Sequence, residues 1–419
     1  MPPDPIQLNE LDAFVAQADA LGMHSHAERN AFLASRSLAY EAAPSLSPFS
    51  AGYAAEVEKT WRAVAARPHY SVLLEHDPNV KADQEQLANL YPFSSRDTRF
   101  IGEYWMGVYF ALKMFDDAPA RSVLEYGVGW GNSTIALLQS GFKVVAVDIE
   151  PKWLRLLEMR AQRDGLDAEL QTIHGVFGDL PAGDAQVGGV LFYECFHHGL
   201  AHDEALERIV PRLMPGGSIV FAGEPVLRDF PIPWGVRLDG HSLWAIRTFG
   251  WMELGFNEDY FIALLRRHNL SVQRHVCPQA GTPGVAYKAT RRADGFSLAH
   301  SMLSSGESGF HAPEADPGIT TRFTDGNACL ELPCGKTGKA RIMFRNWLPH
   351  PLTLKVEVNG KVHLDTEVAA FEICHHSVPL TQGARSDTVR IKSSSFVPQD
   401  LGINADSRRL GIAVGAIML

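Results

Sequence analysis

Two carboxylates and three glycines lie close together in the chain, with types and spacing suited to holding a cofactor. Glu125 belongs to a short apolar run and is followed, at alternate positions, by Gly127, Gly129 and Gly131. Asp148 ends the next apolar run, VVAVD. Glycines allow a tight turn and let a ligand approach the backbone without meeting a Cβ. The stretch therefore predicts a strand, a turn, a helix and a second strand that cradle a nucleotide-containing cofactor.

The spacing of the glycines separates this turn from a dinucleotide site. The pattern is G-x-G-x-G, and Asn132 stands where the G-x-G-x-x-G fingerprint has its last glycine. Glu125 would repel a nearby phosphate, whereas an ammonium or a sulfonium would attract it. The string E-x-G-x-G-x-G followed by Asp148 resembles motifs of class I S-adenosylmethionine-dependent methyltransferases, over residues 120–290. The alternative is a glycine turn of another α/β protein.

The resemblance implies roles for the residues around the turn. Glu125 and the backbone of Gly127–Gly131 are expected to hold the methionine end of S-adenosylmethionine. Asp148 is expected to accept hydrogen bonds from both ribose hydroxyls, with Ile149 beside it among the cofactor contacts. Glu150 lies two residues later on the same strand face and is a second candidate for the ribose.

The segment IHGVFGDLP occupies the position where the family contacts the adenine. The family commonly has Gly-Asp where this chain has Gly175 and Val176. Val176 and Phe177 are therefore expected to sandwich the adenine, while Asp179 reaches its amino group less directly.

Composition narrows the class of protein. The chain has 419 residues, 46% of them apolar, and a formal net charge of −10 without any block of Lys and Arg. Nucleic acid and anionic membranes are therefore disfavoured as partners. The sequence has no signal-peptide pattern and no run of about 18 apolar residues, which predicts a cytoplasmic protein without a membrane span. The five cysteines lack C-x-x-C spacing, which fits a reducing compartment and gives no zinc motif.

Strand and helix patterns alternate from residue 122 onward, which predicts a parallel, doubly wound sheet. The resemblance requires seven strands and implies that the seventh is antiparallel and lies between the fifth and the sixth. The predicted strands are SVLEYG, KVVAVD, AELQTIHG, GGVLFYECF, GSIVFAG, LSVQRHV and GVAYKATR.

The predicted fold class is α/β, a Rossmann-like seven-stranded methyltransferase sheet with an N-terminal helical segment and a C-terminal all-β sandwich. The predicted domains are a helical lead-in or cap over 1–118 and a cofactor-binding domain over 119–292. A linker over 293–318 precedes a β-sandwich over 319–419.

The C-terminal region changes in composition to short alternating segments separated by turn signals, among them Asn359-Gly360. Its last residues, SSSFVPQDLGINADSRRLGIAVGAIML, resemble the tail of small β-sandwich modules found with bacterial glycosyltransferases and surface-polysaccharide enzymes. The resemblance implies carbohydrate contact, and a structural or assembly role is the alternative.

Candidate catalytic residues follow the fourth and fifth predicted strands, in FYECFHHGLAHDEA and FAGEPV. Ligands of open α/β sheets bind beyond the carboxyl ends of the strands. Methyl transfer to a hydroxyl requires removal of its proton, and histidine titrates near neutral pH. His197 or His198 is therefore predicted to be the general base, with Glu194 or Glu224 orienting it or binding the acceptor.

A metal-assisted reaction is an alternative, because His197, His198, His202 and Asp203 offer nitrogen and oxygen donors. The resemblance reproduces no recognised metal triad, so the sequence predicts no metal.

An aromatic and proline-rich insertion follows the fifth strand and combines rings with polar groups, as saccharide recognition requires. Its packing as an ordinary insertion is the alternative. The predicted substrate contacts are Trp234, Arg237, Asp239, His241, Trp244 and Arg247.

Together these features predict an S-adenosylmethionine-dependent methyltransferase that O-methylates a sugar hydroxyl of a glycan or glycan precursor, in polysaccharide biosynthesis. The alternatives are methylation of a non-sugar small metabolite and a non-catalytic binding protein with the same fold. The expected partners are a saccharide or another small-molecule acceptor and, in a homo-oligomer, further copies of the chain.

Overall fold

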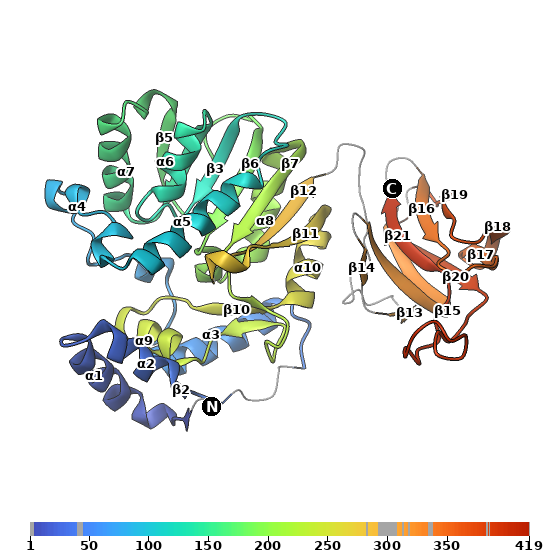
Figure 1. Ribbon diagram of the computed structural model, residues 1–419, viewed down its shortest axis with the longest axis horizontal. Helices are drawn as coiled ribbons and strands as arrows, with labels where there is room; N and C mark the ends of the chain where they lie inside the picture. The colour runs from blue at the N-terminus through green and yellow to red at the C-terminus, as the bar shows by residue number, and fades with distance from the viewer. Residues whose placement is uncertain are drawn as a thin grey trace. The chain divides into compact units, whose positions relative to one another are not determined.

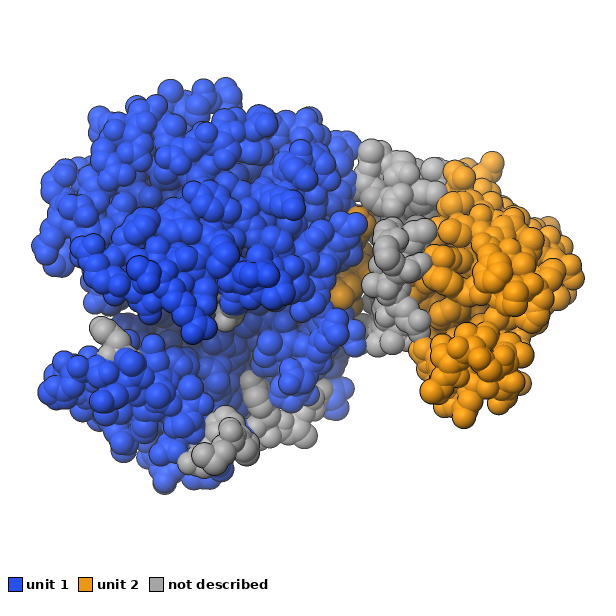
Figure 2. Space-filling model, in the orientation of Figure 1, with its two compact units in different colours: residues 1–261, 272–291 blue, residues 262–271, 292–419 orange. Residues whose placement is uncertain are grey.

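The computed structural model describes residues 4–39, 45–281, 284–291, 308–311, 314–316, 319–333, 338–382, 384 and 386–418. The chain forms two compact units, coloured separately in Figure 2. The first comprises residues 1–261 and 272–291, and the second comprises residues 262–271 and 292–419.

A seven-stranded sheet forms the centre of the first unit, with the order β11-β12-β7-β6-β3-β4-β5 (Figure 1). The strands β3 to β7 pair in parallel, whereas β12 is antiparallel to β7. All seven predicted strands are confirmed, and so is the antiparallel seventh strand between the fifth and the sixth. The strands are β3 (Ser122–Tyr126), β4 (Lys143–Asp148), β5 (Leu170–His174), β6 (Val187–Tyr193), β7 (Leu213–Ala222), β11 (Leu270–Val276) and β12 (Val285–Arg291).

Alternation along the central strands places side chains on both faces of the sheet. Leu191 and Val220 join one apolar core with helices α5, α6 and α7. Phe192 and Phe221 stack at 5.3 Å on the opposite face, where Phe221 also meets Phe261 of α10. The helices around the sheet are α4 (Gln84–Ala88), α5 (Thr98–Lys113), α6 (Asn132–Gln139), α7 (Pro151–Arg163), α8 (His202–Ile209) and α10 (Glu258–Arg267).

The N-terminal helices fold together with the insertion that follows β7. Helix α9 (Gly240–Phe249) contacts α1, α2 and α3, and these four helices lie together below the sheet in Figure 1. Trp234 anchors this packing, because its Nε1 donates to Pro48 O at 2.8 Å and its carbonyl accepts from Tyr53 Oη at 3.0 Å. The other elements here are β1 (Asp4–Pro5), α1 (Leu11–Gly22), α2 (His26–Ala34), β2 (Arg36–Ser37), α3 (Ala51–Ala65), β8 (Val226–Leu227), β9 (Trp234–Val236) and β10 (Leu254–Asn257).

The second unit contains a nine-stranded sheet whose described pairings are antiparallel. Strand β15 pairs with both β20 and β21, so the strands run in one continuous order, and their buried apolar side chains form two clusters. The all-β prediction is therefore confirmed, with one curled sheet in place of two separate ones. The strands are β13 (Ser308–Phe310), β14 (Glu314–Asp316), β15 (Ile319–Pro333), β16 (Lys339–Arg345), β17 (Leu352–Val358), β18 (Lys361–Val368), β19 (Ile373–Pro379), β20 (Ser386–Ser393) and β21 (Ala413–Met418).

The predicted turn at Asn359-Gly360 joins β17 to β18, and both residues have positive φ, 50° and 79°. This matches the two-residue hairpin turn favoured by Asn-Gly. The predicted linker lies largely outside the described residues, and its described part contributes β13 and β14, which pair with β15. Within the described ranges, no helix is both long and apolar enough to cross a membrane.

Candidate functional site

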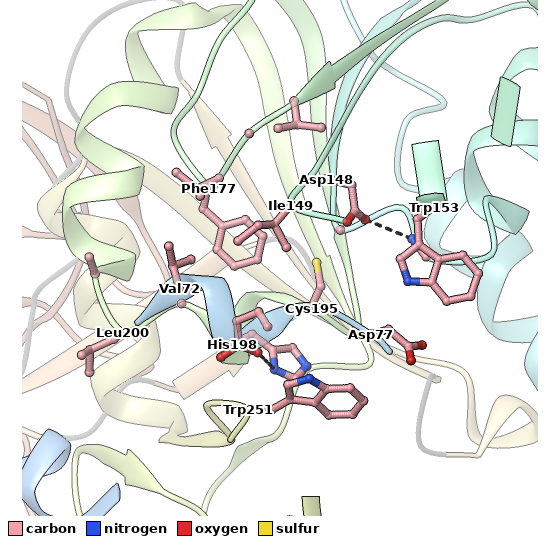
Figure 3. A pocket seen from close by; sticks show the side chains of 18 of the residues that line it. Val72, Asp77, Asp148, Ile149, Trp153, Phe177, Cys195, His198, Leu200 and Trp251 are labelled. Carbon is pink, nitrogen blue, oxygen red and sulfur yellow. Dashed lines mark hydrogen bonds and ion pairs between the residues drawn. The ribbon is translucent and has the colours of Figure 1, made fainter. Parts of the chain in front are cut away.

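A cavity of about 520 Å³ opens at the carboxyl ends of β3, β4 and β6. Figure 3 shows Asp148, Ile149 and Phe177 on one part of its wall and His198 and Trp251 on another. The first group comes from the predicted cofactor cradle, and the second comes from the turn after β6 and from the insertion. The sheet edge therefore gathers residues from distant parts of the chain around one space.

The glycine turn forms one wall of this cavity through Gly127 and Gly129. Gly127, Gly129 and Gly131 have φ of 65°, 47° and 71°, values that residues other than glycine rarely adopt. A Cβ on Gly127 would lie 2.6 Å from Cys195 Cβ, whereas a Cβ on Gly129 would meet no atom within 4 Å. Gly129 thus presents bare backbone to open space, as a close-fitting cofactor requires.

Glu125 is buried behind the glycine turn, with 1% of its surface exposed, and is not among the residues that line the cavity. Its carboxylate accepts hydrogen bonds from the hydroxyls of Ser133 and Thr134 at the start of α6. Burial raises the pKa of Glu125 to about 7, although the two hydroxyls favour the charged form. Glu125 therefore lies behind the glycine turn and holds the start of α6. Its contact with the methionine end of the cofactor stays a prediction.

Asp148 lies at the end of β4 and lines the cavity with Ile149. Its carboxylate accepts from Gly129 N at 3.3 Å and from Glu150 N at 2.8 Å. Burial raises the pKa of Asp148 to about 6, against the effect of these amides. The Glu150 side chain has other partners, because it caps α7 and its Oε2 lies 2.9 Å from His76 Nδ1. Of the two ribose candidates, only Asp148 lines the cavity.

The predicted adenine segment follows β5. Val176 and Phe177 line the cavity, while Asp179 does not. Asp179 instead accepts a hydrogen bond from Val176 N at 2.9 Å and stabilises the turn. The segment therefore offers apolar contacts to a flat ring.

Glu194 ends β6 at the cavity wall and has a positive φ of 51°. Its side chain is exposed to the open space of the cavity. Gly223 makes room for it, because a Cβ at that position would lie 2.5 Å from Glu194 Cγ. Although part of its surface faces the cavity, protein atoms close around the carboxylate reduce its hydration, which, with a smaller effect of Glu224, raises the pKa of Glu194 to about 7.

The two predicted catalytic histidines have different surroundings. His197 is buried and does not line the cavity, and its Nδ1 lies 2.8 Å from Glu224 Oε2. Glu224 also accepts from the amides of Cys195, Phe196 and His197, which fixes the turn after β6.

His198 lines the cavity, with its Nδ1 3.1 Å from Glu75 Oε2. Burial alone would lower the pKa of His198, but the Glu75 carboxylate outweighs it and raises the pKa to about 9. Glu75 is itself held by Tyr70 Oη at 2.8 Å and by Met252 N at 2.7 Å.

The predicted substrate contacts of the insertion lie outside the residues that line this cavity. Several of them have partners in the N-terminal helices or within the insertion. Trp244 Nε1 donates to Asp19 at 2.8 Å, and Arg247 bonds Asp12 at 2.9 Å.

Asp239 caps α9 and pairs with Arg237 at 3.1 Å. Trp234 is buried, and His241 is exposed. These contacts favour a packing role, and a role in acceptor binding stays a prediction.

Sequence reasoning missed cavity residues that come from before the sheet. Tyr70, Val72, Glu75 and Asp77 line the cavity, as does Trp251. The segment HYSVLLEHDP shows no motif, and its place at the cavity depends on the packing of the N-terminal region against the sheet edge. Trp251 lies in the insertion but was not distinguished there from its other aromatic residues.

Comparison with known proteins finds similarity over the region of the seven-stranded sheet. A family model described as a methyltransferase domain matches residues 123–217. An uncharacterized methyltransferase from Geobacillus kaustophilus is 35% identical over 121 residues, covering 28% of this chain and 53% of that protein. A demethylmenaquinone methyltransferase from Tropheryma whipplei is 25% identical over 161 residues, covering 38% of this chain and 65% of that protein. The chain thus spans less than two thirds of the length of either relative.

Among solved structures, 1,6-didemethyltoxoflavin-N1-methyltransferase from Burkholderia thailandensis, with bound S-adenosylhomocysteine, is 24% identical with a TM-score of 0.33. The match covers 48% of this chain and 83% of that chain.

The matched residues contain the glycine turn, Asp148, the apolar segment after β5 and Glu194. The bare backbone at Gly129 and the apolar wall at Phe177 fit the methionine end and the base of the expected cofactor. Residues 123–217 therefore match a methyltransferase domain, and S-adenosylmethionine is the cofactor that its cradle fits.

Proposed function

We infer that the chain transfers the methyl group of S-adenosylmethionine to a hydroxyl of a saccharide or a saccharide-containing small acceptor. The observation that carries this inference is the set of residues that line the cavity beside Asp148. Its cofactor part contains the glycine turn, Asp148 and Phe177, and its remaining wall carries Glu194 and His198. An acid–base group and a cofactor cradle in one space are what methyl transfer to a hydroxyl requires.

The main chemical question is which side chain accepts the proton of the acceptor hydroxyl. The sequence predicts His197 or His198 for this role. His197 does not line the cavity, and the Nδ1 of each ring already faces a carboxylate. Glu194 faces the open space with a pKa near 7, so we assign the base to Glu194 and keep the Glu75–His198 pair as the second candidate.

The reaction balances with Glu194 as the acceptor of the proton. The bound cofactor supplies a methyl group on a sulfonium, whose C–S bond breaks with its electron pair going to sulfur as the C–O bond forms. The hydroxyl proton passes to the Glu194 carboxylate. The acceptor oxygen has to lie about 3 to 3.5 Å from the methyl carbon in the reactive complex.

A pocket in the second unit supports a saccharide acceptor over other small molecules. This pocket, of about 340 Å³, is lined by rings of Phe323, Trp347 and Phe396 together with Asn404 and Asp406. Aromatic faces combined with a few polar groups suit binding of a sugar, which has apolar C–H faces and polar edges. The resemblance of the C-terminal residues to modules of polysaccharide-building enzymes points to the same ligand class and to polysaccharide biosynthesis.

The test is release of S-adenosylhomocysteine by the full chain with a panel of mono- and oligosaccharides and a matched panel of non-sugar hydroxyl compounds. We expect turnover with a saccharide, and turnover only with non-sugar compounds would refute the saccharide assignment. Absence of turnover with both panels, while cofactor binding is normal, would count against methyl transfer to a hydroxyl.

Glu194→Gln tests the base, and Glu207→Gln, which alters an exposed carboxylate of α8, is its control. A general base contributes about 10²- to 10⁴-fold to the rate, so we expect a loss of kcat in this range for Glu194→Gln with unchanged cofactor affinity. Turnover equal to that of Glu207→Gln would transfer the role to His198. Because the base must be ionised, kcat/KM of the unaltered chain should rise with pH and level off above about 7.

A further inference from the structure

Two histidines and a glutamate beside the cavity bring potential metal-binding atoms together. One ring nitrogen of His197, one of His198 and one carboxylate oxygen of Glu253 all lie within 4.8 Å of one another. His197 Nε2 is 3.8 Å from Glu253 Oε2. Two ligand atoms bound about 2.1 Å from one ion stand about 3 to 3.4 Å apart, so small side-chain rotations would complete the site.

Each histidine of this group has a carboxylate beside its Nδ1. Glu224 Oε2 lies 2.8 Å from Nδ1 of His197, and Glu75 Oε2 lies 3.1 Å from Nδ1 of His198. Metal-binding histidines almost always direct their second ring nitrogen at a carboxylate, a carbonyl or a water, which fixes the tautomer and the ring orientation. The pair His197–Glu224 reproduces this arrangement, and His198 has Glu75 beside its Nδ1 at the distance of an ion pair, without hydrogen-bond geometry.

The charges around the group favour a cation. Three carboxylates, of Glu75, Glu224 and Glu253, surround the two imidazoles. Arg237 lies 3.7 Å from Glu253 Oε2, but it also pairs with Asp239 at 3.1 Å and so keeps a partner when a metal takes the Glu253 oxygen.

The neighbouring histidine is unsuited to the same role. His202 has Nδ1 3.1 Å from Gly199 O and Nε2 2.8 Å from Tyr260 Oη, so both of its nitrogens are engaged. The site therefore differs from the set of donors that the sequence offers as the metal alternative, because Glu253 takes the place of His202 and Asp203.

We propose that His197, His198 and Glu253 bind one divalent transition-metal ion at the wall of the methyltransferase cavity. Two imidazoles and one carboxylate suit ions such as Zn²⁺, Fe²⁺ or Mn²⁺. Three protein ligands leave coordination positions open, and His198 borders the cavity (Figure 3). An acceptor hydroxyl bound there would be polarised and more easily deprotonated. The proposal goes beyond methyl transfer itself, does not depend on which acceptor is used, and leaves Glu194 as the base, because a metal-bound His198 could not accept the acceptor proton.

The test measures metal binding directly, without relying on turnover. The chain of 419 residues, without an affinity tag, is stripped of metal with a chelator. Its affinity for Zn²⁺, Mn²⁺ and Co²⁺ is then measured by calorimetry, with elemental analysis for stoichiometry. The variants are His198→Ala and Glu253→Gln, which each remove a ligand, and Glu75→Gln, which alters the carboxylate beside Nδ1 of His198. The control is His174→Ala, which removes an exposed histidine outside the group.

We expect one ion per chain for the unaltered protein and for His174→Ala. Glu75→Gln should bind about 10- to 100-fold more weakly, as for other residues that orient metal ligands, and the two ligand variants more weakly still. If His198→Ala does not fold, Glu253→Gln and Glu75→Gln decide the matter. The proposal is overturned if the folded, unaltered chain binds none of the ions, or if Glu253→Gln and Glu75→Gln bind them as tightly as His174→Ala does.

Discussion

Gly127→Ala is predicted to destabilise the methyltransferase domain through two separable effects. The first is the backbone, because φ at this position is 65° and a residue with a Cβ pays about 1 to 2 kcal/mol there. The second is packing, because the new Cβ would lie 2.6 Å from Cys195 Cβ and 2.9 Å from its Sγ. Overpacking of this kind costs about 1 to 3 kcal/mol. The free energy of unfolding should therefore fall by about 2 to 5 kcal/mol.

Gly129→Ala is the matched control for this prediction. Its φ is 47°, but its Cβ would meet no atom within 4 Å and would point into the cavity space. We expect only the backbone cost of about 1 to 2 kcal/mol, together with a loss of cofactor affinity.

Thermal unfolding followed by circular dichroism measures the stability of both variants. At about 2 to 4 °C per kcal/mol for a domain of this size, Gly127→Ala should lower the Tm by about 4 to 20 °C. A second change, Cys195→Gly, removes the atoms that clash and should restore the packing part of the loss. Equal Tm values for Gly127→Ala and Gly129→Ala, with no rescue by Cys195→Gly, would refute the assignment of a tight contact behind the turn.

Two further predictions concern buried polar groups. The pKa of Glu125 is raised to about 7 from 4.5, so its contribution to stability is complete below pH 4.5 and is lost as pH rises through 7, by about 3 kcal/mol. Glu125→Gln should therefore gain in Tm relative to the unaltered chain between pH 5 and pH 8, and a constant difference would show that Glu125 does not titrate in this range. Asn346, 1% exposed, donates to the carbonyls of His350, Val368 and Ala369 and accepts from Leu348 N. Asn346→Ala should lower the free energy of unfolding of the second unit by about 2 to 4 kcal/mol, as measured by calorimetry, and should leave cofactor affinity unaltered. A stability equal to that of the unaltered chain would contradict this prediction.

Four strands of the methyltransferase sheet, β3, β4, β6 and β7, could be predicted from apolar runs followed by a turn or helix signal. The other three mix apolar and polar residues, and their prediction depended on the alternation of strand and helix patterns and on the family resemblance. The position of the seventh strand came from the family resemblance, and the pairing of β12 with β7 confirms it. In the second unit the short alternating segments predicted an all-β region, and Asn359-Gly360 predicted the hairpin that joins β17 to β18. The continuous order of strands through β15 could not be read from the sequence, because pairing over long separations leaves no local signal.

The candidate site could be predicted only in part for a similar reason. Gly129, Asp148 and Phe177 line the cavity because they follow strand ends, which the sequence reveals. Glu75 reaches the same cavity from the N-terminal region, and no pattern in its own segment indicates it.

The insertion contains residues that the sequence predicted to contact the substrate but that do not line the cavity. Trp244 and Arg247 have the residue types of a saccharide site, but they contact Asp19 and Asp12 of the N-terminal helices and do not line the cavity. Residue type alone could not distinguish these two outcomes.

The central claim is that the cavity beside Asp148 binds S-adenosylmethionine, and calorimetric titration at pH 8 tests it most directly. The unaltered chain should bind with micromolar affinity, about 8 kcal/mol. Asp148→Asn removes a charge-assisted hydrogen bond worth about 1.5 to 3 kcal/mol and should bind at least about tenfold more weakly. Glu150→Gln, an acid two residues away that faces His76, should bind like the unaltered chain. Absence of binding by the folded, unaltered chain, or equal affinity for Asp148→Asn and Glu150→Gln, would contradict the account.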